Sequence, residues 1–600
     1  MMKNTILIFL GGLFPFSVLA GEIEWKVENP FRFIQDAQND EFKIEKSQST
    51  LDFVQQRMKD RNTAKFPPIT STQWIRDPSL SQRLPSGYAF PKTVLISAWL
   101  PKDILGVCEW RYGEFVEKRA CNEKVTFNAQ TQFGDMSKTF LSVNILESGK
   151  LIKEQIIVKD RLILGVGDSY ASGEGNPDIP TVADPQKIDN LAKNNATRII
   201  SGRWMKYKDS WVQINAEWLD RQCHRSFFSQ HILAGMKLAS MNTKESITLI
   251  PLACSGAEVL DGVLISQANP PGGGRRVTES QLNAAIRYLC PSNTQLQSSK
   301  KYFHRVYTGG TVKVVGEKRL KCAGQIRMPD AILLSIGGND VGFSPAITWA
   351  ALPNGHRNFF GWSSVKLTNK FIKPICPKYT DQKLCQKNRP VAKDRVNNWL
   401  SSYYSDLATE LLDAGMSQDG SNIYLTAYPN PSFIEDGKTL CSVKQSADVL
   451  EQARTQLPRI VRTGVWEIQI TPSELQDINV GLIEPLYNKM KHNAEIHRWN
   501  FIDQHVNQTL NHGVCAGYHR DMTNFPIFPH VRQGEWYPQK PTEEWAFDVS
   551  KQRWFRNTND SLLFQTDDTS GSINGAFHPD FRMHAFIADV LAEKIRQKWK

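Results

Sequence analysis

After its first twenty residues, the 600-residue sequence has no apolar run of membrane-spanning length, which predicts a chain that is soluble once that segment is removed. Its ten cysteines include no CxxC pair, and no HExxH or comparable spacing joins His505, His512, His519 and His530. Metal sites in proteins are usually recognisable by such ligand spacings. The sequence therefore predicts no metal and no other cofactor.

Signatures of nucleotide and nucleic-acid binding are also missing. The glycine-rich loop at residues 270–276 lacks the Gly-Lys-Ser/Thr ending of a P-loop. The net charge is +11, but Lys and Arg are scattered apart from short runs such as residues 318–321. This pattern favours a solvated basic surface over a dedicated patch, with an anionic membrane surface or acidic polysaccharide as the partner such a charge would attract. No motif predicts a nucleic-acid partner.

The first twenty residues have the pattern of a secretory signal peptide. Lys3 precedes an apolar run at 6–16, and Val18-Leu19-Ala20 forms a small-residue cleavage site, so the mature chain is expected to begin at Gly21. A retained anchor is the alternative. We expect a secreted or periplasmic protein, in which cysteines form disulfides. The candidates by position are Cys108 with Cys121, Cys290 with Cys322, and Cys376 with Cys385.

Residues 21–158 are predicted to form an N-terminal β-rich domain. Strand signals at 94–100, 125–127, 141–146 and 156–158 are separated by turns, and a short helix is predicted at 51–58. A small sandwich-like domain fits this pattern. It would either stabilise the rest of the chain by packing or recognise a carbohydrate or a surface.

Residues 159–600 alternate strand and helix signals, which predicts an α/β domain with a parallel sheet and several insertions. Five core strands are expected, at 162–166, 247–252, 331–336, 423–427 and 499–503. Apolar residues at helical spacing predict helices around 396–411 and 583–591. A hairpin is expected around Gly309-Gly310.

Four chemically suggestive positions follow these strands or open the last helix. Ser169 lies in the glycine-rich turn Gly-Asp-Ser-Tyr after the first strand, where a nucleophile would be exposed at the carboxyl edge of the sheet. Gly256 and Asn339 follow the second and third strands and can offer N–H donors to an oxyanion. His578 precedes the last helix and is the candidate base.

In this order the four elements resemble the SGNH/GDSL hydrolases, and smaller matches resemble secreted bacterial lipases and esterases of that family. These matches are Cys223-His224-Arg225-Ser226, Ala253-Cys254-Ser255-Gly256-Ala257, Tyr428-Pro429-Asn430-Pro431 and His512-Gly513-Val514-Cys515-Ala516. The resemblance covers residues 160–598 and implies a flavodoxin-like three-layer α/β/α fold and ester hydrolysis through an acyl-enzyme. It implies Ser169 as nucleophile, His578 as general base, and the Ser169 N–H, Gly256 N–H and Asn339 amide as the oxyanion hole. By the same analogy, Cys223 pairs with Cys254 and Cys441 with Cys515.

The chain departs from the family at the third member of the triad. The family usually has an aspartate three residues before the histidine, and here that residue is Gly575. The Gly575 carbonyl is the first candidate to orient the imidazole, which gives a Ser169 and His578 dyad supported by backbone. Asp567, Asp568 and the neighbouring Asp560 are alternatives, whereas Asp580 follows the histidine too closely.

Three functions compete at this stage. The first is a lipolytic esterase acting on fatty-acyl or phospholipid esters, and the second is a carbohydrate esterase that removes acetyl groups from a polysaccharide. The third is a catalytically silent binding protein on the same fold. An acyltransferase also fits, because an alcohol can intercept the acyl-enzyme in place of water.

Overall fold

The computed structural model describes residues 23–34, 42–60, 84–85, 87–179, 182–183, 212–268, 277–291, 296–308, 311–342, 396, 399–441, 475–476, 478–514, 516, 530–532, 535–537, 552–556, 561, 565 and 574–599. The chain divides into two compact units. The β unit comprises Met1–Asn29 with Pro91–Lys159, and the α/β unit comprises Pro30–Phe90 with Asp160–Lys600. The predicted signal peptide lies outside the described residues. Within them, no helix is both long and apolar enough to cross a membrane.

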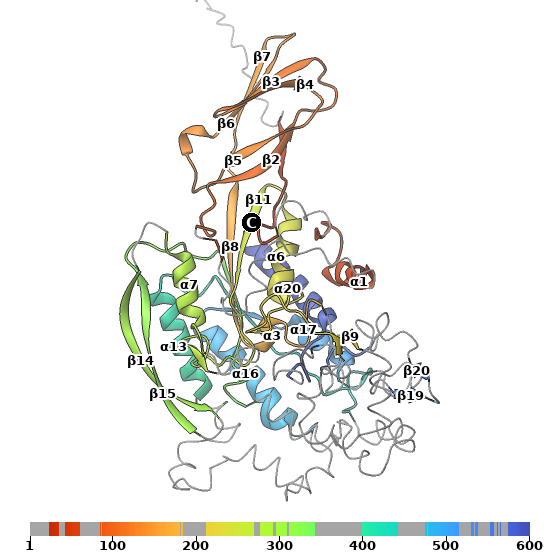
Figure 1. The fold of residues 1–600 in the computed structure, drawn as a ribbon, viewed down its shortest axis with the longest axis vertical. Coiled ribbons are helices and arrows are strands. Elements are labelled where there is room, and N and C mark those ends of the chain that lie inside the picture. Colours follow the sequence, from red (N-terminus) through yellow and green to blue (C-terminus); the bar gives the residue numbers. More distant parts are fainter. Residues whose placement is uncertain are drawn as a thin grey trace, which may run out of the picture. The chain divides into compact units, whose positions relative to one another are not determined.

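The β unit contains two antiparallel sheets (Figure 1). One has the order β1 (Glu24–Val27), β2 (Thr93–Trp99), β5 (Val125–Gln130). The other has the order β4 (Phe115–Ala120), β3 (Val107–Tyr112), β6 (Phe140–Ile145), β7 (Lys150–Gln155). Alternate residues along β3 and β5 are buried, as a sheet with one face in a core requires. The core contains Trp110 and Phe127, and the Cys108–Cys121 disulfide joins the ends of β3 and β4.

Residues 30–90 belong to the α/β unit, so the boundary differs from the expected continuous domain at 21–158. Phe31 forms a parallel bridge with Ile247, and its ring lies so close to Gly235 that a Cβ there would be 2.8 Å away. Helix α1 (Thr50–Asp60) begins at Thr50, whose backbone N–H donates to Asp589 at 3.0 Å. These partners are more than 190 residues away along the chain, and local strand and helix signals carry no information about them.

The α/β unit is built on a five-stranded sheet of order β11 (Glu245–Pro251), β8 (Lys159–Gly167), β16 (Ala331–Ser335), β17 (Ile423–Thr426), β18 (Asn500–Ile502). The pairs β8 with β16, β16 with β17, and β17 with β18 are parallel. The first four strands are almost wholly buried, which explains their continuous apolar sequence. All five strands coincide with the predicted segments. The fold is therefore mixed α/β, with a parallel sheet in one unit and antiparallel sheets in the other.

Helices flank this sheet (Figure 1). Helices α6 (Gln230–Met241) and α20 (Phe581–Trp599) lie on one side of β8, and α7 (Gln281–Leu289) and α13 (Leu400–Asp413) lie on the other. A π-helix (Asn479–Ile483) leads into α16 (Glu484–Ile496), and α17 (Gln504–Gln508) and a 3-10 turn (Leu510–His512) follow β18. The predicted hairpin is present as β14 (Leu296–Thr308) and β15 (Thr311–Cys322). The smaller antiparallel pairs are β9 (Val182–Ala183) with β10 (Val212–Ile214), β12 (Gln267–Ala268) with β13 (Val277–Thr278), and β19 (His530–Arg532) with β20 (Glu535–Tyr537).

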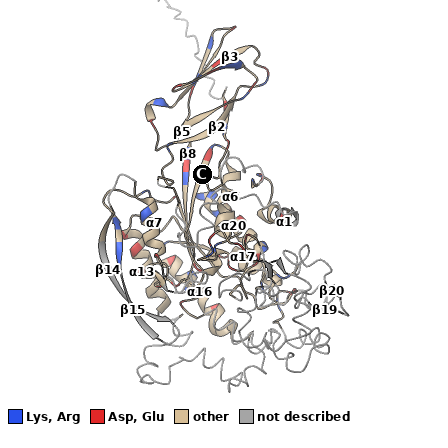
Figure 2. Cartoon of the chain, viewed as in Figure 1, with Lys and Arg blue, Asp and Glu red and all other residues tan. Residues whose placement is uncertain are grey.

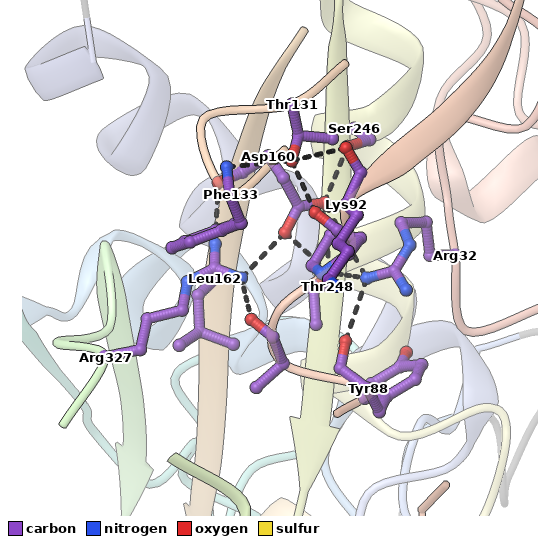
Figure 3. A network of polar contacts seen from close by, with 12 residues as sticks. Arg32, Tyr88, Lys92, Thr131, Phe133, Asp160, Leu162, Ser246, Thr248 and Arg327 are labelled. Atoms are coloured by element: carbon purple, nitrogen blue, oxygen red, sulfur yellow. Dashed lines mark hydrogen bonds and ion pairs between the residues drawn. The ribbon is translucent and has the colours of Figure 1, made fainter. Parts of the chain in front are cut away.

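A buried polar network surrounds Asp160 near the start of β8 (Figure 3). The Asp160 carboxylate accepts hydrogen bonds from Ser246 at 2.6 Å and Thr248 at 2.8 Å, and pairs with the Arg327 guanidinium at 2.9 Å. Arg32 donates to the Tyr88 carbonyl at 3.1 Å on the same side. Because a buried charge is tolerated only when it is paired and hydrogen-bonded, this network ties residues 32 and 88 to the sheet. It lies at the opposite end of β8 from Ser169.

Candidate active site

Ser169 lies in the turn after β8, where it opens the short helix α3 (Ser169–Ser172). Gly167 has a φ of 144°, and a Cβ at that position would come 2.2 Å from the Ser335 carbonyl oxygen, so the turn requires glycine. Asp168 caps α3, since its carboxylate accepts the Tyr170 N–H at 3.0 Å. The backbone therefore turns at the carboxyl end of β8 and presents Ser169 at the edge where open α/β sheets bind ligands.

This turn is fixed by Gln281 of α7, which sequence reasoning missed. The Gly167 N–H donates to Gln281 Oε1 at 2.8 Å, and Gln281 Nε2 donates to the Gly167 carbonyl at 2.8 Å. The side chain is buried, so both hydrogen bonds are sheltered from water. No local pattern singles out this glutamine, because its partner, the backbone of Gly167, lies 114 residues earlier in the chain.

Gly256 and Asn339 lie in the loops after β11 and β16, the two strands that flank β8 in the sheet. Gly256 has a left-handed φ of 79°. The Cys254 N–H, two residues earlier, donates to the Gly167 carbonyl at 3.1 Å. Asn339 Nδ2 donates to the Ala257 carbonyl at 3.0 Å, which places the amide beside the Gly256 loop. The predicted nucleophile turn and both predicted donor loops thus meet at one edge of the sheet.

Tyr428 joins two of these loops. Its hydroxyl donates to the Asp168 carboxylate and accepts the Gly338 N–H at 2.9 Å. Burial raises the pKa of Asp168 to about 7, even though the hydrogen bond from Tyr428 opposes that shift. Tyr428 therefore couples the turn that carries Ser169 to the loop that carries Asn339.

His578 is buried beside the turn that carries Ser169. Its ring centroid lies 5.0 Å from that of Tyr170, and the Tyr170 hydroxyl donates to the Phe577 carbonyl at 2.9 Å. The ring Nδ1 lies 3.1 Å from the Ala576 carbonyl oxygen. Because a carbonyl oxygen only accepts, Nδ1 carries the proton and Nε2 carries the lone pair. Among the described residues, Nε2 has no hydrogen-bond partner.

The surroundings of His578 keep it neutral. Burial lowers the pKa of this imidazole, and the opposing effects of the Glu174 charge and the Ala576 and Gly575 carbonyls do not cancel that shift. A neutral imidazole with a lone pair on Nε2 is the form that can accept a proton.

Two backbone carbonyls act on this ring. The ring Nδ1 lies 3.1 Å from the Ala576 carbonyl oxygen. The carbonyl of Gly575, the expected partner, also raises the pKa of the ring and accepts the backbone N–H of His578 at 3.0 Å. Phe577, between Ala576 and His578, has a left-handed φ of 62°. Asp580 caps α20 and accepts a hydrogen bond from Arg582 Nε at 2.7 Å. Asp560, Asp567 and Asp568 lie outside the described residues.

Glu174 and His224 form a fully buried pair that sequence reasoning also missed. His224 Nδ1 lies 2.9 Å from Glu174 Oε1 and 3.0 Å from Oε2. Both residues occur in stretches that the sequence already marks, Glu174 between two glycines of the nucleophile turn and His224 within Cys-His-Arg-Ser. The feature of the sequence that could have indicated this pair is a charged residue, Glu174, flanked by two glycines in the turn after a buried strand.

Disulfides brace the loops around this edge. Cys223 is bonded to Cys254, which ties the loop before α6 to the loop that carries Gly256. Cys290 is bonded to Cys322 at the base of the hairpin. Cys441 is also disulfide-bonded, and its expected partner Cys515 lies outside the described residues, as do Cys376 and Cys385.

The histidines considered as metal ligands contact backbone carbonyls instead. His505 Nε2 lies 2.9 Å from the Ala427 carbonyl, and His512 Nδ1 lies 2.6 Å from that of Gln552. His519 and the side chain of His530 lie outside the described residues. Across the described part of the chain, no three His, Cys, Asp or Glu side chains form a group that could hold a metal ion.

Comparison with known proteins leaves the family open. No protein-family model matches the chain, and no curated protein sequence matches it. The chain aligns with a solved structure from a study of a carbohydrate esterase whose active site displays divergent catalytic and non-catalytic binding functions. That alignment has 11% identity and a TM-score of 0.18, and it covers 67% of this chain and 90% of the other. A TM-score of this size carries no argument about fold or function.

Proposed function

We propose that this chain is an exported serine ester hydrolase of the SGNH type, in which Ser169 forms an acyl-enzyme and His578 is the general base. One observation carries the proposal. Three neighbouring strands, β11, β8 and β16, deliver Gly256, Ser169 and Asn339 to one edge of the sheet, and buried His578 lies against Tyr170, the residue after Ser169. A serine hydroxyl becomes nucleophilic only when a base accepts its proton, and this edge combines the serine, the base and the donors.

The fold supports the same proposal. Numbered along the chain, the parallel strands have the order 2-1-3-4-5 with helices on both sides, which is the order of flavodoxin-like three-layer α/β/α domains. Such sheets bind ligands beyond the carboxyl ends of their strands, where Ser169 lies. The disulfides agree with export to an oxidising compartment.

The chemistry proceeds in two steps. Ser169 Oγ attacks the ester carbonyl carbon while His578 Nε2 takes its proton, and the oxyanion accepts hydrogen bonds from the Ser169 and Gly256 N–H groups and the Asn339 amide. The tetrahedral intermediate collapses, the alcohol leaves with the proton from His578, and an acyl-Ser169 ester remains. Water, deprotonated by His578, then attacks that ester and releases the acid and free Ser169.

The test is hydrolysis of p-nitrophenyl esters from acetyl to palmitoyl by the mature protein and by Ser169→Ala. We expect turnover by the mature protein and a loss of at least about 10³-fold in the variant, because no other group attacks the ester. A preference for acetyl would identify a deacetylase, and a preference for long chains a lipolytic enzyme. Equal rates in the two proteins, or no turnover by a folded sample, would contradict the proposal.

A further inference from the structure

Glu174 is a buried carboxylate for which the proposed acyl transfer has no role. It follows Gly173, the left-handed cap of α3, and its backbone N–H donates to the Ser169 carbonyl at 3.1 Å. Its side chain is completely buried. Removing a carboxylate from water is costly unless paired groups compensate, so a charge in this position calls for a physical explanation.

The groups around Glu174 come from several segments of the candidate active site. His224 Nδ1 lies 2.9 Å from its carboxylate, and Gln565 Nε2 donates to it at 2.8 Å. Ser255, the residue before Gly256, also hydrogen-bonds to it. Glu174 therefore links the nucleophile turn to the loop of the proposed oxyanion hole.

The backbone beside Glu174 packs directly on the turn at residues 574–577 that precedes His578. A Cβ added to Gly575 would lie 2.7 Å from the Gly175 Cα, so the two glycines are in close approach. Asn176 Nδ2 donates to the Pro579 carbonyl at 2.8 Å, and Arg556 Nε donates to the Gly175 carbonyl at 3.1 Å. The carboxylate is thereby held at a fixed position relative to the imidazole.

His224 is itself rigid. Its ring stacks on Trp218 with the centroids 4.4 Å apart and the planes within 4° of parallel. Its backbone φ of 45° is left-handed, a strained conformation for a residue other than glycine. The surroundings must impose such a conformation. His224 is therefore held in its position against the Glu174 carboxylate.

The charges around His578 favour an effect of Glu174 on this imidazole. Although burial by itself raises the pKa of Glu174, the neighbouring His224, the nearby His578 and the hydrogen bond from Ser255 bring it below its usual value. The carboxylate is therefore ionised, and its charge raises the pKa of His578. Within the described part of the chain, Tyr170 of α3, neutral and buried His584 of α20, and Arg556, whose backbone N–H donates to the His578 carbonyl, also lie near this imidazole.

We propose, resting on the function above, that Glu174 is a positioning residue for His578: a fixed buried charge that takes the place of the family's aspartate. The position three residues before the histidine is glycine, and the imidazole Nδ1 is bonded to the uncharged Ala576 carbonyl. During acyl transfer His578 becomes an imidazolium, and the Glu174 carboxylate stabilises that charge electrostatically while His224 and Gln565 hold the carboxylate in place.

The test is Glu174→Gln, which removes the charge and keeps the side-chain shape. We expect the acidic limb of the kcat/KM profile to move to lower pH by roughly one unit, because the imidazole loses a stabilising anion. The plateau of kcat should fall about tenfold or more, with KM within about twofold, since Glu174 is buried away from substrate. A histidine-selective NMR titration of the same variant should show the His578 pKa moving in the same direction.

Two further variants separate electrostatics from packing. Asp178→Asn alters another buried carboxylate of the same loop, one that accepts the Phe227 N–H at 2.7 Å, and should lower the melting temperature without moving the acidic limb. Glu174→Asp keeps the charge but withdraws it by one methylene, so it should give a smaller shift in the same direction. It also provides the measurement if Glu174→Gln does not fold.

The outcomes distinguish the two proposals. An active wild-type protein whose acidic limb coincides with those of both Glu174 variants would overturn the role of Glu174 and leave the serine hydrolase intact. A wild-type protein without Ser169-dependent turnover would contradict the enzyme, and the NMR titration would still decide whether Glu174 sets the His578 pKa.

Discussion

Asn339 is the side-chain donor proposed for the oxyanion, and its amide is oriented by the hydrogen bond to the Ala257 carbonyl at 3.0 Å. Asn339→Ala should lower kcat by about 10² to 10³, which corresponds to a barrier increase of about 2.7–4 kcal/mol. The loss of one partly buried hydrogen bond should cost only about 1 kcal/mol of stability. Steady-state kinetics together with thermal unfolding measure both effects.

A matched control is Asn500→Ala. Asn500 Nδ2 donates to the carbonyls of Ser421 and Ile423 at 2.8 and 2.9 Å, in β18 and away from Ser169. This variant removes the same chemical group and comparable hydrogen bonds, so it should reduce stability similarly and leave kcat unchanged. Equal kcat losses in the two variants would mean that Asn339 acts only through folding.

At the level of elements, the two disulfides with nearly equal loops offer a comparison. The Cys223–Cys254 bond closes a separation of 31 residues and the Cys290–Cys322 bond one of 32. Loop entropy therefore predicts a similar loss of about 3–4 kcal/mol when either pair is replaced by alanine. The kinetic effects should differ, because Cys254 is two residues from Gly256 and its N–H donates to the Gly167 carbonyl.

We expect the Cys223→Ala/Cys254→Ala double variant to lose about tenfold or more in kcat. If the Gly256 N–H moves out of position, the oxyanion is less stabilised, and a barrier increase of about 1.4 kcal/mol lowers the rate tenfold. The Cys290→Ala/Cys322→Ala variant should keep kcat within about twofold at a temperature where both are folded. Denaturant unfolding checks the matched stabilities. If the hairpin variant loses as much kcat as the other, the brace on the Gly256 loop has no special catalytic effect.

The burial of a strand affects whether it can be predicted from the sequence. Core strands such as β16, whose five residues are all buried, form continuous apolar runs that are readable without a structure. Strands β1, β3, β4 and β7 were not predicted. Of these, β4 and β7 are edge strands rich in charged residues, with little regular burial. Placing residues 30–90 required the bridge from Phe31 to Ile247, a pairing across more than two hundred residues.

Within the candidate site, residues next to strand ends were predictable and residues that support them were not. Ser169, Gly256 and Asn339 each follow an apolar strand, so position and residue type agree. Glu174, Gln281 and Tyr428 act through hydrogen bonds to segments distant in sequence. Glu174 and Tyr428 lie in stretches that the sequence marks, but the hydrogen bonds that give all three residues their positions are tertiary contacts.

For the whole molecule, the sequence has a net charge of +11. Figure 2 shows the Lys and Arg residues of the described part of the chain distributed over several elements, including β3, α7 and β15, without gathering on one of them. The ionisable groups that matter most for global stability are instead buried. Four described histidines, His224, His231, His505 and His584, are at most 1% exposed, and the first of them pairs with Glu174.

Burial lowers the pKa of His231 and of His584 to about 3 and that of His505 to about 4. Above the ordinary histidine pKa of 6.5, both folded and unfolded chains hold these rings neutral, so they cause no pH dependence. As the pH falls below 6.5, these three histidines become protonated in the unfolded chain but stay neutral in the folded chain. Each histidine then costs about 1.4 kcal/mol per pH unit down to its folded pKa. Asp168, whose pKa is raised to about 7, offsets one of the three between about pH 7 and 4.

His584 provides the direct test, because among the described residues neither of its ring nitrogens has a hydrogen-bond partner. His584→Leu should be close to neutral for stability at pH 7.5 and should stabilise the protein by about 2 kcal/mol at pH 5, which is 1.5 pH units at about 1.4 kcal/mol each. His492→Leu, at an exposed position of α16, is the matched control and should retain the wild-type dependence. Denaturant unfolding at both pH values measures the difference. If the two variants lose stability equally between pH 7.5 and 5, the buried imidazole is not a source of the acid sensitivity, and the ring must be protonated within the folded protein.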